Sequence, residues 1–224
     1  MRYVELRRHT DNDGDKLSEK GVADAEAIGK TGLHPPYAAF VSTGAERATA
    51  MLRILRRAAG QDEIPITTET GLRSAVEDRW REAAKVAGKG ASIDEMRAVD
   101  PDLVEHETQL LGSALRRVAE SLPEGGRALV VGHSPTNEAA VYGLVGQTIA
   151  AMGKGEGVLV AEDSGRYEGR YAEARWWTFA TIGWPRTSWP AASASAKRCG
   201  AVSGKASSVG TARGSAVRGA RRSG

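Results

Sequence analysis

Hydrophobic positions along the chain fall into two patterns that alternate as far as about residue 183. Short apolar runs bounded by turn-forming residues predict strands, whereas apolar residues at helical spacing predict helices. Strands are expected over 2–7, 38–42, 64–68, 127–131, 157–161 and 174–180, and helices over 18–30, 45–59, 74–86, 92–96, 102–122 and 134–145. Alternating strands and helices predict a three-layer α/β/α fold with a mostly parallel central sheet.

A few residues mark where these elements begin. Ser18 is suited to cap the first helix, because its hydroxyl can accept a hydrogen bond from a free backbone N–H group of the first turn. Ser134 and Pro135 are expected to cap and open the last predicted helix in the same way. Pro65 cannot donate to a neighbouring strand, so its strand is expected at the edge of the sheet.

Composition places the chain among soluble globular proteins. Its 224 residues are 41% hydrophobic and 26% charged, and no apolar run is long enough to cross a membrane. The N-terminus has no apolar segment of the kind that a signal peptide needs. Cys199 is the single cysteine, which excludes an internal disulfide and a multi-cysteine zinc site. A cytoplasmic location is therefore expected.

Charge divides the chain into two predicted parts. Residues 184–224 contain eight of the 31 basic residues and no Asp or Glu, and they are rich in Ser, Ala and Gly. Such a segment buries too little apolar surface to order itself, so we expect a disordered basic tail after a domain over 1–183. That domain has 23 basic and 28 acidic residues. Nucleic-acid binding is therefore expected at most from the tail, and the oligomeric state is left open.

Three of the predicted strands end in residues suited to binding and attacking phosphate. Arg8 and His9 follow the first strand, Arg47 follows the second, and His133 follows the strand over 127–131. The carboxyl ends of parallel strands meet at one edge of a sheet, so these side chains are expected in one crevice. A guanidinium holds an oxyanion with two hydrogen bonds, and a neutral imidazole is a nucleophile for phosphorus.

These motifs, in this order, resemble the histidine phosphatase superfamily, whose members have the phosphoglycerate mutase-like fold. The resemblance spans about residues 2–183 and rests on Arg8-His9, Leu17-Ser18-Glu19-Lys20-Gly21, Ser42 with Arg47, and Gly132-His133. It implies a metal-independent enzyme without a cofactor. It also implies that His9 becomes phosphohistidine, and that Arg8, Arg47 and His133 bind the phosphate.

The chain departs from the family pattern at two places near the expected nucleophile. Thr10 stands where the family has glycine, and its hydroxyl would either contact the phosphate or crowd His9. The segment before Arg47 keeps the serine and the arginine of the family motif but has Gly44 in place of proline. His34 and His106 have no partner at metal-ligand spacing, so no metal site is expected.

A leaving alkoxide needs a proton, so a carboxylic acid is expected to face the site. The resemblance places this acid between Arg47 and His133, and the candidates are Glu69, Glu77 and Glu82. Ser74 stands where the family motif has its carboxylate. Glu77, one helical turn further on, is the preferred candidate.

The resemblance favours a phosphatase that acts on a small phosphate ester or a phosphoprotein. Hydrolysis is favoured over mutase activity, because the chain after Arg47 lacks the long insertion with which the family's glycolytic mutases retain their intermediate. The alternative is a catalytically weak or silent member of the same fold that binds a phosphorylated ligand or a protein. Thr10 and the uncertain acid are the features that keep this alternative open.

Overall fold

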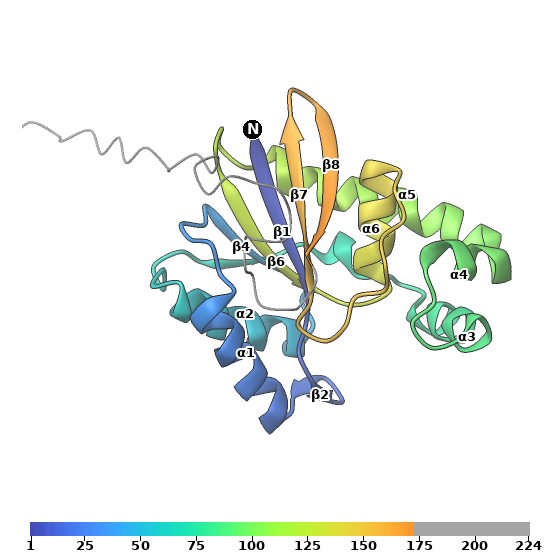
Figure 1. The fold of residues 1–224 in the computed structure, drawn as a ribbon, viewed down its shortest axis with the longest axis horizontal. Coiled ribbons are helices and arrows are strands. Elements are labelled where there is room, and N and C mark those ends of the chain that lie inside the picture. The colour runs from blue at the N-terminus through green and yellow to red at the C-terminus, as the bar shows by residue number, and fades with distance from the viewer. Residues whose placement is uncertain (173–224) are drawn as a thin grey trace, which may run out of the picture. The chain divides into compact units, whose positions relative to one another are not determined.

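The computed structural model describes residues 1–172, which form an α/β fold around one main sheet (Figure 1). The predicted strand over 174–180 and the predicted tail over 184–224 lie outside the described residues. Within them, the expected mixed architecture with a mostly parallel central sheet is confirmed. None of the described helices is long and apolar enough to cross a membrane.

The main sheet has six strands in the order β5-β4-β6-β1-β7-β8. The pairs β5–β4, β4–β6 and β6–β1 are parallel, whereas β7 runs antiparallel to both β1 and β8. β5 lies at the edge, as Pro65 predicted. The strands are β1 (Arg2–Arg8), β4 (Ala39–Ser42), β5 (Ile66–Thr68), β6 (Arg127–Gly132), β7 (Gly157–Asp163) and β8 (Arg166–Ala172), and a separate small hairpin pairs β2 (Asn12–Asp13) with β3 (Lys16–Leu17).

Helices cover both faces of the sheet, and successive residues of β6 show why. Leu129 and Val131 belong to the core beneath one pair of helices, and Ala128 and Val130 belong to the core beneath the other pair. This alternation is what a strand buried on both faces requires. The first pair is α1 (Glu19–Thr31) and α2 (Glu46–Ala58), the second is α5 (Pro101–Glu120) and α6 (Thr136–Val145), and the 3-10 turn η1 (Thr70–Leu72) leads to α3 (Glu77–Ala87) and α4 (Ile93–Val99) beside α5.

The capping predictions have different outcomes at the two helices concerned. The Ser18 hydroxyl accepts a hydrogen bond from the Gly21 backbone N–H at 3.0 Å, so α1 is capped as expected. The predicted cap of α6 is wrong, because Pro135 is the N-cap residue and the helix begins at Thr136. The Ser134 hydroxyl instead donates to the Glu138 carboxylate at 2.6 Å.

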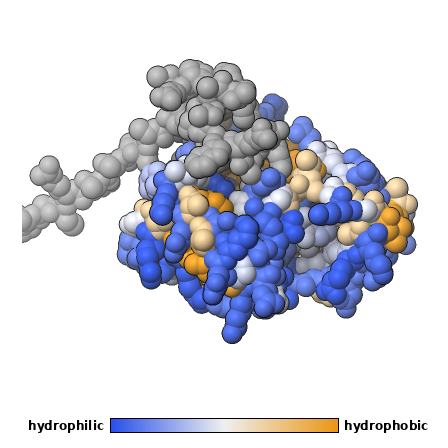
Figure 2. All heavy atoms as spheres, turned by 60° about the horizontal axis from the view of Figure 1, so that its bottom comes forward, coloured by the Kyte–Doolittle hydropathy of each residue, from blue (hydrophilic) through white to orange (hydrophobic). Residues whose placement is uncertain are grey.

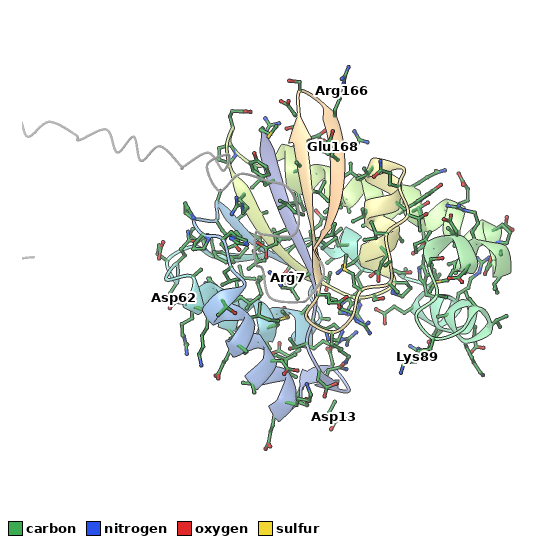
Figure 3. All side chains as sticks on the ribbon, viewed as in Figure 1. Arg7, Asp13, Asp62, Lys89, Arg166 and Glu168 are labelled. Carbon is green, nitrogen blue, oxygen red and sulfur yellow. The ribbon has the colours of Figure 1, made fainter. Side chains whose placement is uncertain are left out.

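The hairpin of β7 and β8 differs from the sequence prediction, which had no strand between the predicted strands over 157–161 and 174–180. Ser164 and Gly165 have φ angles of 53° and 81°, which suit the tight two-residue turns of hairpins. β8 carries exposed charged residues, including Arg166 and Glu168, at the end of the hairpin shown in Figure 3. Their polarity concealed the strand, because a charged strand at a sheet edge lacks the apolar run of a buried one.

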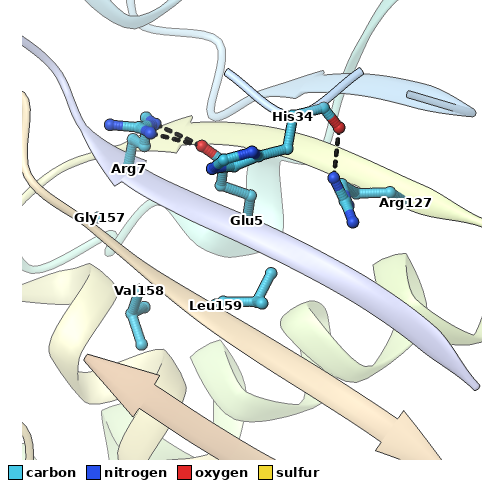
Figure 4. A pocket seen from close by; sticks show the side chains of 7 residues that line it. All are labelled: Glu5, Arg7, His34, Arg127, Gly157, Val158 and Leu159. Carbon is cyan, nitrogen blue, oxygen red and sulfur yellow. Dashed lines mark hydrogen bonds and ion pairs between the residues drawn. The ribbon is translucent and has the colours of Figure 1, made fainter. Parts of the chain in front are cut away.

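A buried charge network fixes the carboxyl end of β1 (Figure 4). The Arg7 guanidinium donates to the Glu5 carboxylate at 2.6 Å, and the Tyr37 hydroxyl donates to the same carboxylate at 2.7 Å. Arg7 also donates to the carbonyl oxygens of Gly32 at 2.5 Å and Gly155 at 3.2 Å. Arg7 lies inside the fold, in contrast to Lys89 and Asp62 at its periphery (Figure 3). The strand end is therefore joined to the end of α1 and to the turn before β7.

Candidate active site

The two histidines expected at the site meet at the carboxyl edge of the sheet. Arg8 lies opposite Gly132 in the parallel pairing of β1 with β6, and the His9 backbone N–H donates to the Gly132 carbonyl at 3.0 Å. The imidazole rings of His9 and His133 then lie 5.2 Å apart between centroids, edge to face at 63°. Residues 124 positions apart in the sequence are thus neighbours because their strands are neighbours.

Hydrogen bonds fix which nitrogen of His9 carries the proton. The Arg47 guanidinium can only donate, and its Nε lies 3.2 Å from His9 Nε2. Nε2 is therefore the acceptor, and the proton of the neutral ring is on Nδ1, which donates to the Thr10 carbonyl at 2.7 Å. The lone pair of Nε2 points to the side where Arg47 lies.

Both rings are held in the neutral form. His9 is 5% exposed, and burial lowers its pKa to about 4. The positive charges of Arg47, Lys154 and Arg8 contribute to this lowering of the His9 pKa, while the Thr10 carbonyl opposes it. Burial likewise lowers the pKa of His133 to about 3, assisted mainly by Arg47. An unprotonated imidazole is the form that can act as a nucleophile.

Arg47 lies in the first turn of α2 and is held by a carboxylate. Its Nη1 donates to Asp15 at 2.7 Å. The turn before it is stiffened without proline, because the Ser42 hydroxyl accepts from the Gly44 backbone N–H at 3.0 Å and bonds to the Thr49 hydroxyl at 2.7 Å. Gly44 has a φ of 90°, a conformation that favours glycine.

His133 is fixed on both its ring and its backbone. Its Nε2 lies 2.9 Å from the Thr43 hydroxyl, and its backbone N–H donates to the Asn137 side chain at 3.1 Å. Its Nδ1 is buried and has no hydrogen-bond partner among the described residues. Gly132 leaves room for Asn137, because a Cβ there would lie 2.2 Å from the Asn137 side-chain oxygen.

Arg8 is anchored by the segment that precedes β7. Its Nη1 donates to the Met152 carbonyl at 2.6 Å, and burial lowers its pKa while Glu138 and Glu156 oppose that effect. Glu138 is 2% exposed and accepts hydrogen bonds from the Ser134 hydroxyl and the Met152 backbone N–H, each at 2.6 Å. Burial raises the pKa of Glu138. Arg8 and Glu138 thus both form hydrogen bonds with the backbone of Met152.

Comparison with solved structures identifies the fold. A phosphoglycerate mutase from Bacillus anthracis covers 76% of this chain and 92% of its own, at 19% identity and a TM-score of 0.58. The chain has the phosphoglycerate mutase-like fold. The match to a phosphoserine phosphatase from Entamoeba histolytica covers 78% of this chain and 98% of that protein, at 11% identity and a TM-score of 0.60. The match to a mycobacterial glucosyl-3-phosphoglycerate phosphatase covers the same shares of the two chains, at 19% identity and a TM-score of 0.55. No protein-family model and no curated protein matches the sequence.

Within this phosphoglycerate mutase-like fold, the Thr10 hydroxyl, which the sequence offered as a phosphate contact, is directed to α1. The Thr10 side chain is fully buried, and its hydroxyl donates to the Gly21 carbonyl at 2.7 Å. A Cβ on Gly21 would lie 1.9 Å from the Asp11 carbonyl oxygen, so only glycine permits this close approach. The Ser18 hydroxyl completes the junction by donating to the Asp11 carboxylate at 2.7 Å. Thr10 therefore fixes the loop after His9 against α1.

The three candidate acids have different partners. Glu77 is paired with Arg73 at 2.6 Å, and its side chain is 36% exposed. The positive charge of Arg73 contributes to lowering the pKa of His133, which places Arg73 within electrostatic reach of that histidine. Glu77 and Arg73 also line an open cavity of about 530 Å³ with other residues of 73–81. Glu77 therefore contacts Arg73, and the charge of Arg73 in turn acts on His133.

Glu69 and Glu82 are engaged elsewhere. The Glu69 carboxylate accepts from the Gly71 backbone N–H and from Arg117, each at 3.0 Å, so it caps η1 and ties that turn to α5. Glu82 points to solvent, with its side chain 72% exposed and Lys85 at 3.9 Å. Of the three candidates, Glu77 is the one whose partner, Arg73, influences the pKa of His133.

Several residues of the site were not found from the sequence. They are Asp15, Thr43, Arg73, Glu138 and Lys154. Asp15 lies in the Asp-rich loop after His9, which was a usable signal for a partner to an arginine. Lys154 precedes a strand that runs antiparallel to β1, so a search restricted to residues after strands misses it.

The face turned forward in Figure 2 is largely hydrophilic, with small separate hydrophobic areas. Within residues 1–172, no group of three or more His, Cys, Asp or Glu side chains is arranged to hold a metal ion. His106 is exposed on α5, and His34 is half-buried beside Glu5 in the small cavity of Figure 4.

Proposed function

We propose that the protein is a metal-independent phosphatase that hydrolyses phosphomonoesters through a phosphohistidine on His9. The observation that carries the proposal is the state of His9: its ring is neutral, its Nδ1 proton is held by Thr10, and its Nε2 lone pair faces Arg47 at 3.2 Å. A nucleophile beside a fixed cation is what attack on a negatively charged phosphoryl group requires.

In the first step, Nε2 of His9 attacks phosphorus in line with the ester oxygen. The N–P bond forms as the P–O bond breaks, and the ester oxygen leaves with the bonding electron pair. Arg8 and Arg47 offset the charge on the equatorial oxygens, and His133 donates a hydrogen bond to one of them. Water then attacks phosphorus in the second step, releasing phosphate and the free imidazole.

Glu77 is the proposed donor of the proton that the leaving oxygen needs. Its carboxylate is paired with Arg73 in the unliganded site. A bound phosphoryl group competes for the Arg73 guanidinium, so Glu77 is released beside the leaving group, where its carboxylate takes up a proton from solvent and passes it to the leaving oxygen. The same carboxylate can take a proton from the attacking water in the second step.

The fold neighbours suggest the substrate class. Two of them are described as phosphatases for glucosyl-3-phosphoglycerate and for phosphoserine, which are small phosphate esters. We propose a substrate of this class, with a phosphoprotein as the other candidate, for a protein that acts in the cytoplasm without a cofactor. The catalytic domain is proposed to span residues 1–183, and the basic tail over 184–224 is proposed to take no part in catalysis.

The proposal is tested with an aryl phosphate and a metal chelator in the assay. An aryl leaving group needs little help from an acid, so the assay tests the nucleophile and the phosphate site alone. Turnover in the presence of chelator is expected. A wild-type protein that binds inorganic phosphate but does not turn over would replace the proposal with the silent, ligand-binding alternative.

Glu77→Gln is expected to separate two kinds of substrate. Turnover of an alkyl phosphate should fall by about 100-fold, because its leaving group needs a proton, whereas turnover of an aryl phosphate should fall by less than about threefold. Steady-state kinetics with both substrates provide the measurement. Glu82→Gln, one to two helical turns away on α3, is the matched control and should change neither rate. Equal slowing of both substrates by Glu77→Gln would remove Glu77 from this role.

A further inference from the structure

The turn before β7 belongs to the same edge of the sheet as the ends of β1 and β6. Because β7 runs antiparallel to β1, its first residues lie beside the last residues of β1. Backbone hydrogen bonds join the two segments: Arg8 N–H donates to the Glu156 carbonyl at 2.8 Å, and Gly155 N–H donates to the carbonyls of Arg8 at 3.2 Å and His9 at 3.3 Å. Residues 152–156 are hereafter called the β7 loop.

The β7 loop is held at each end by groups from other elements. Glu138 of α6 accepts the Met152 backbone N–H at 2.6 Å, and Arg7 of β1 donates to the Gly155 carbonyl at 3.2 Å. Within the loop, the Gly153 N–H donates to the Glu156 carboxylate at 2.6 Å. A residue between these anchors has a defined position relative to His9.

Lys154 is that residue, and its ammonium group is directed to the loop that follows His9. It donates to the Asn12 side chain and lies 3.5 Å from the Asp11 carboxylate. The charge of Lys154 contributes to lowering the pKa of His9. The pKa of Lys154 itself is lowered mainly by burial and to a smaller extent by the charges of Arg8 and Arg47, whereas Asp11 raises it. Three cations therefore repel one another around the nucleophile, and an anion bound among them relieves that repulsion.

We propose that Lys154 is a further phosphate-binding residue of this site, carried into position by the β7 loop. The inference rests on the proposed function, since it concerns the phosphoryl group that His9 attacks. Asn12 and Asp11 hold the ammonium in the unliganded protein, and the phosphoryl oxygens of the substrate replace part of that contact. Lys154 thus adds a point charge beside the planar donors of Arg8 and Arg47.

The test measures binding of inorganic phosphate by calorimetry, which does not depend on turnover. Lys154→Met should weaken phosphate binding about tenfold, which corresponds to about 1.4 kcal/mol. Lys154→Arg keeps the charge and should stay within about threefold of the wild type. Lys89→Met is the control, because Lys89 is exposed at the periphery between α3 and α4 and should leave the affinity unchanged (Figure 3).

A second measurement separates phosphate binding from a merely structural role. In an NMR titration, Lys154→Met should raise the pKa of His9, because one of the charges that disfavour the imidazolium is gone. Unchanged phosphate affinity, or an unchanged His9 pKa in the folded variant, would overturn the proposal. If Lys154→Met does not fold, Lys154→Gln keeps a donor to Asn12 and is used instead. Loss of turnover with normal phosphate binding by the wild type would count against the phosphatase function and leave the Lys154 proposal intact.

Discussion

His9→Ala is expected to abolish hydrolysis of an aryl phosphate, lowering kcat on the order of 10⁴-fold or more. The variant lacks the imidazole nitrogen whose lone pair is oriented by Thr10 and Arg47. A water molecule in the vacated space is a weaker nucleophile, and Arg47 alone does not activate it. Removal of the nucleophile therefore costs more than removal of any single phosphate contact.

The matched control is His106→Ala, which removes a histidine that is exposed on α5. Its kcat should equal that of the wild type. Labelling from a ³²P-labelled phosphate ester should give an acid-labile protein adduct in the wild type and in His106→Ala, but none in His9→Ala. A labelled His9→Ala protein would show that another residue is the nucleophile.

The part of the candidate site that the sequence predicted consists of residues at the carboxyl ends of parallel strands, which meet at one edge of the sheet. Arg8, His9, Arg47 and His133 each lie at or beyond the end of a strand in the parallel part of the sheet. Parallel neighbours bring their carboxyl ends together whatever the sequence separation. The apolar runs that reveal these strands are strong, because both faces of the strands are buried. The fold and this group of four residues could therefore be predicted from the pattern of apolar residues along the sequence.

Residues outside this group of four depend on three-dimensional choices between partners. Ser134 has a good cap position in the sequence, yet its hydroxyl donates to the Glu138 carboxylate. The same carboxylate accepts a hydrogen bond from the Met152 backbone N–H. Lys154 lies before an antiparallel strand, and neither its direction nor its neighbour β1 can be read from local spacing. The candidate acids likewise differ only in what they pair with, since all three are glutamates at or near a helix.

Acidification is expected to destabilise the protein through its two buried histidines. In the folded state His9 and His133 have pKa values of about 4 and about 3, whereas an unfolded histidine titrates near 6.5. Between pH 6.5 and 4 the unfolded chain therefore binds more protons than the folded one. The free energy of unfolding should fall as the pH is lowered through this window, by up to about 1.4 kcal/mol per pH unit for each histidine.

Urea unfolding at several pH values between 7.5 and 4.5 provides the measurement. In the double variant His9→Gln with His133→Asn, neither position titrates, so the slope between pH 6.5 and 4.5 should become clearly shallower. Part of the slope should remain, because burial also lowers the pKa of His34. His106→Ala is the control for removing a histidine from the exposed surface of α5 and should keep most of the wild-type slope. The carboxylates whose pKa values are lowered, such as Asp100 and Glu162, lose their contribution only at lower pH, so they do not mask the effect. Equal slopes in the wild type and the double variant would mean that these rings are not held neutral by burial, and the case for an unprotonated nucleophile at neutral pH would then rest on their ordinary pKa alone.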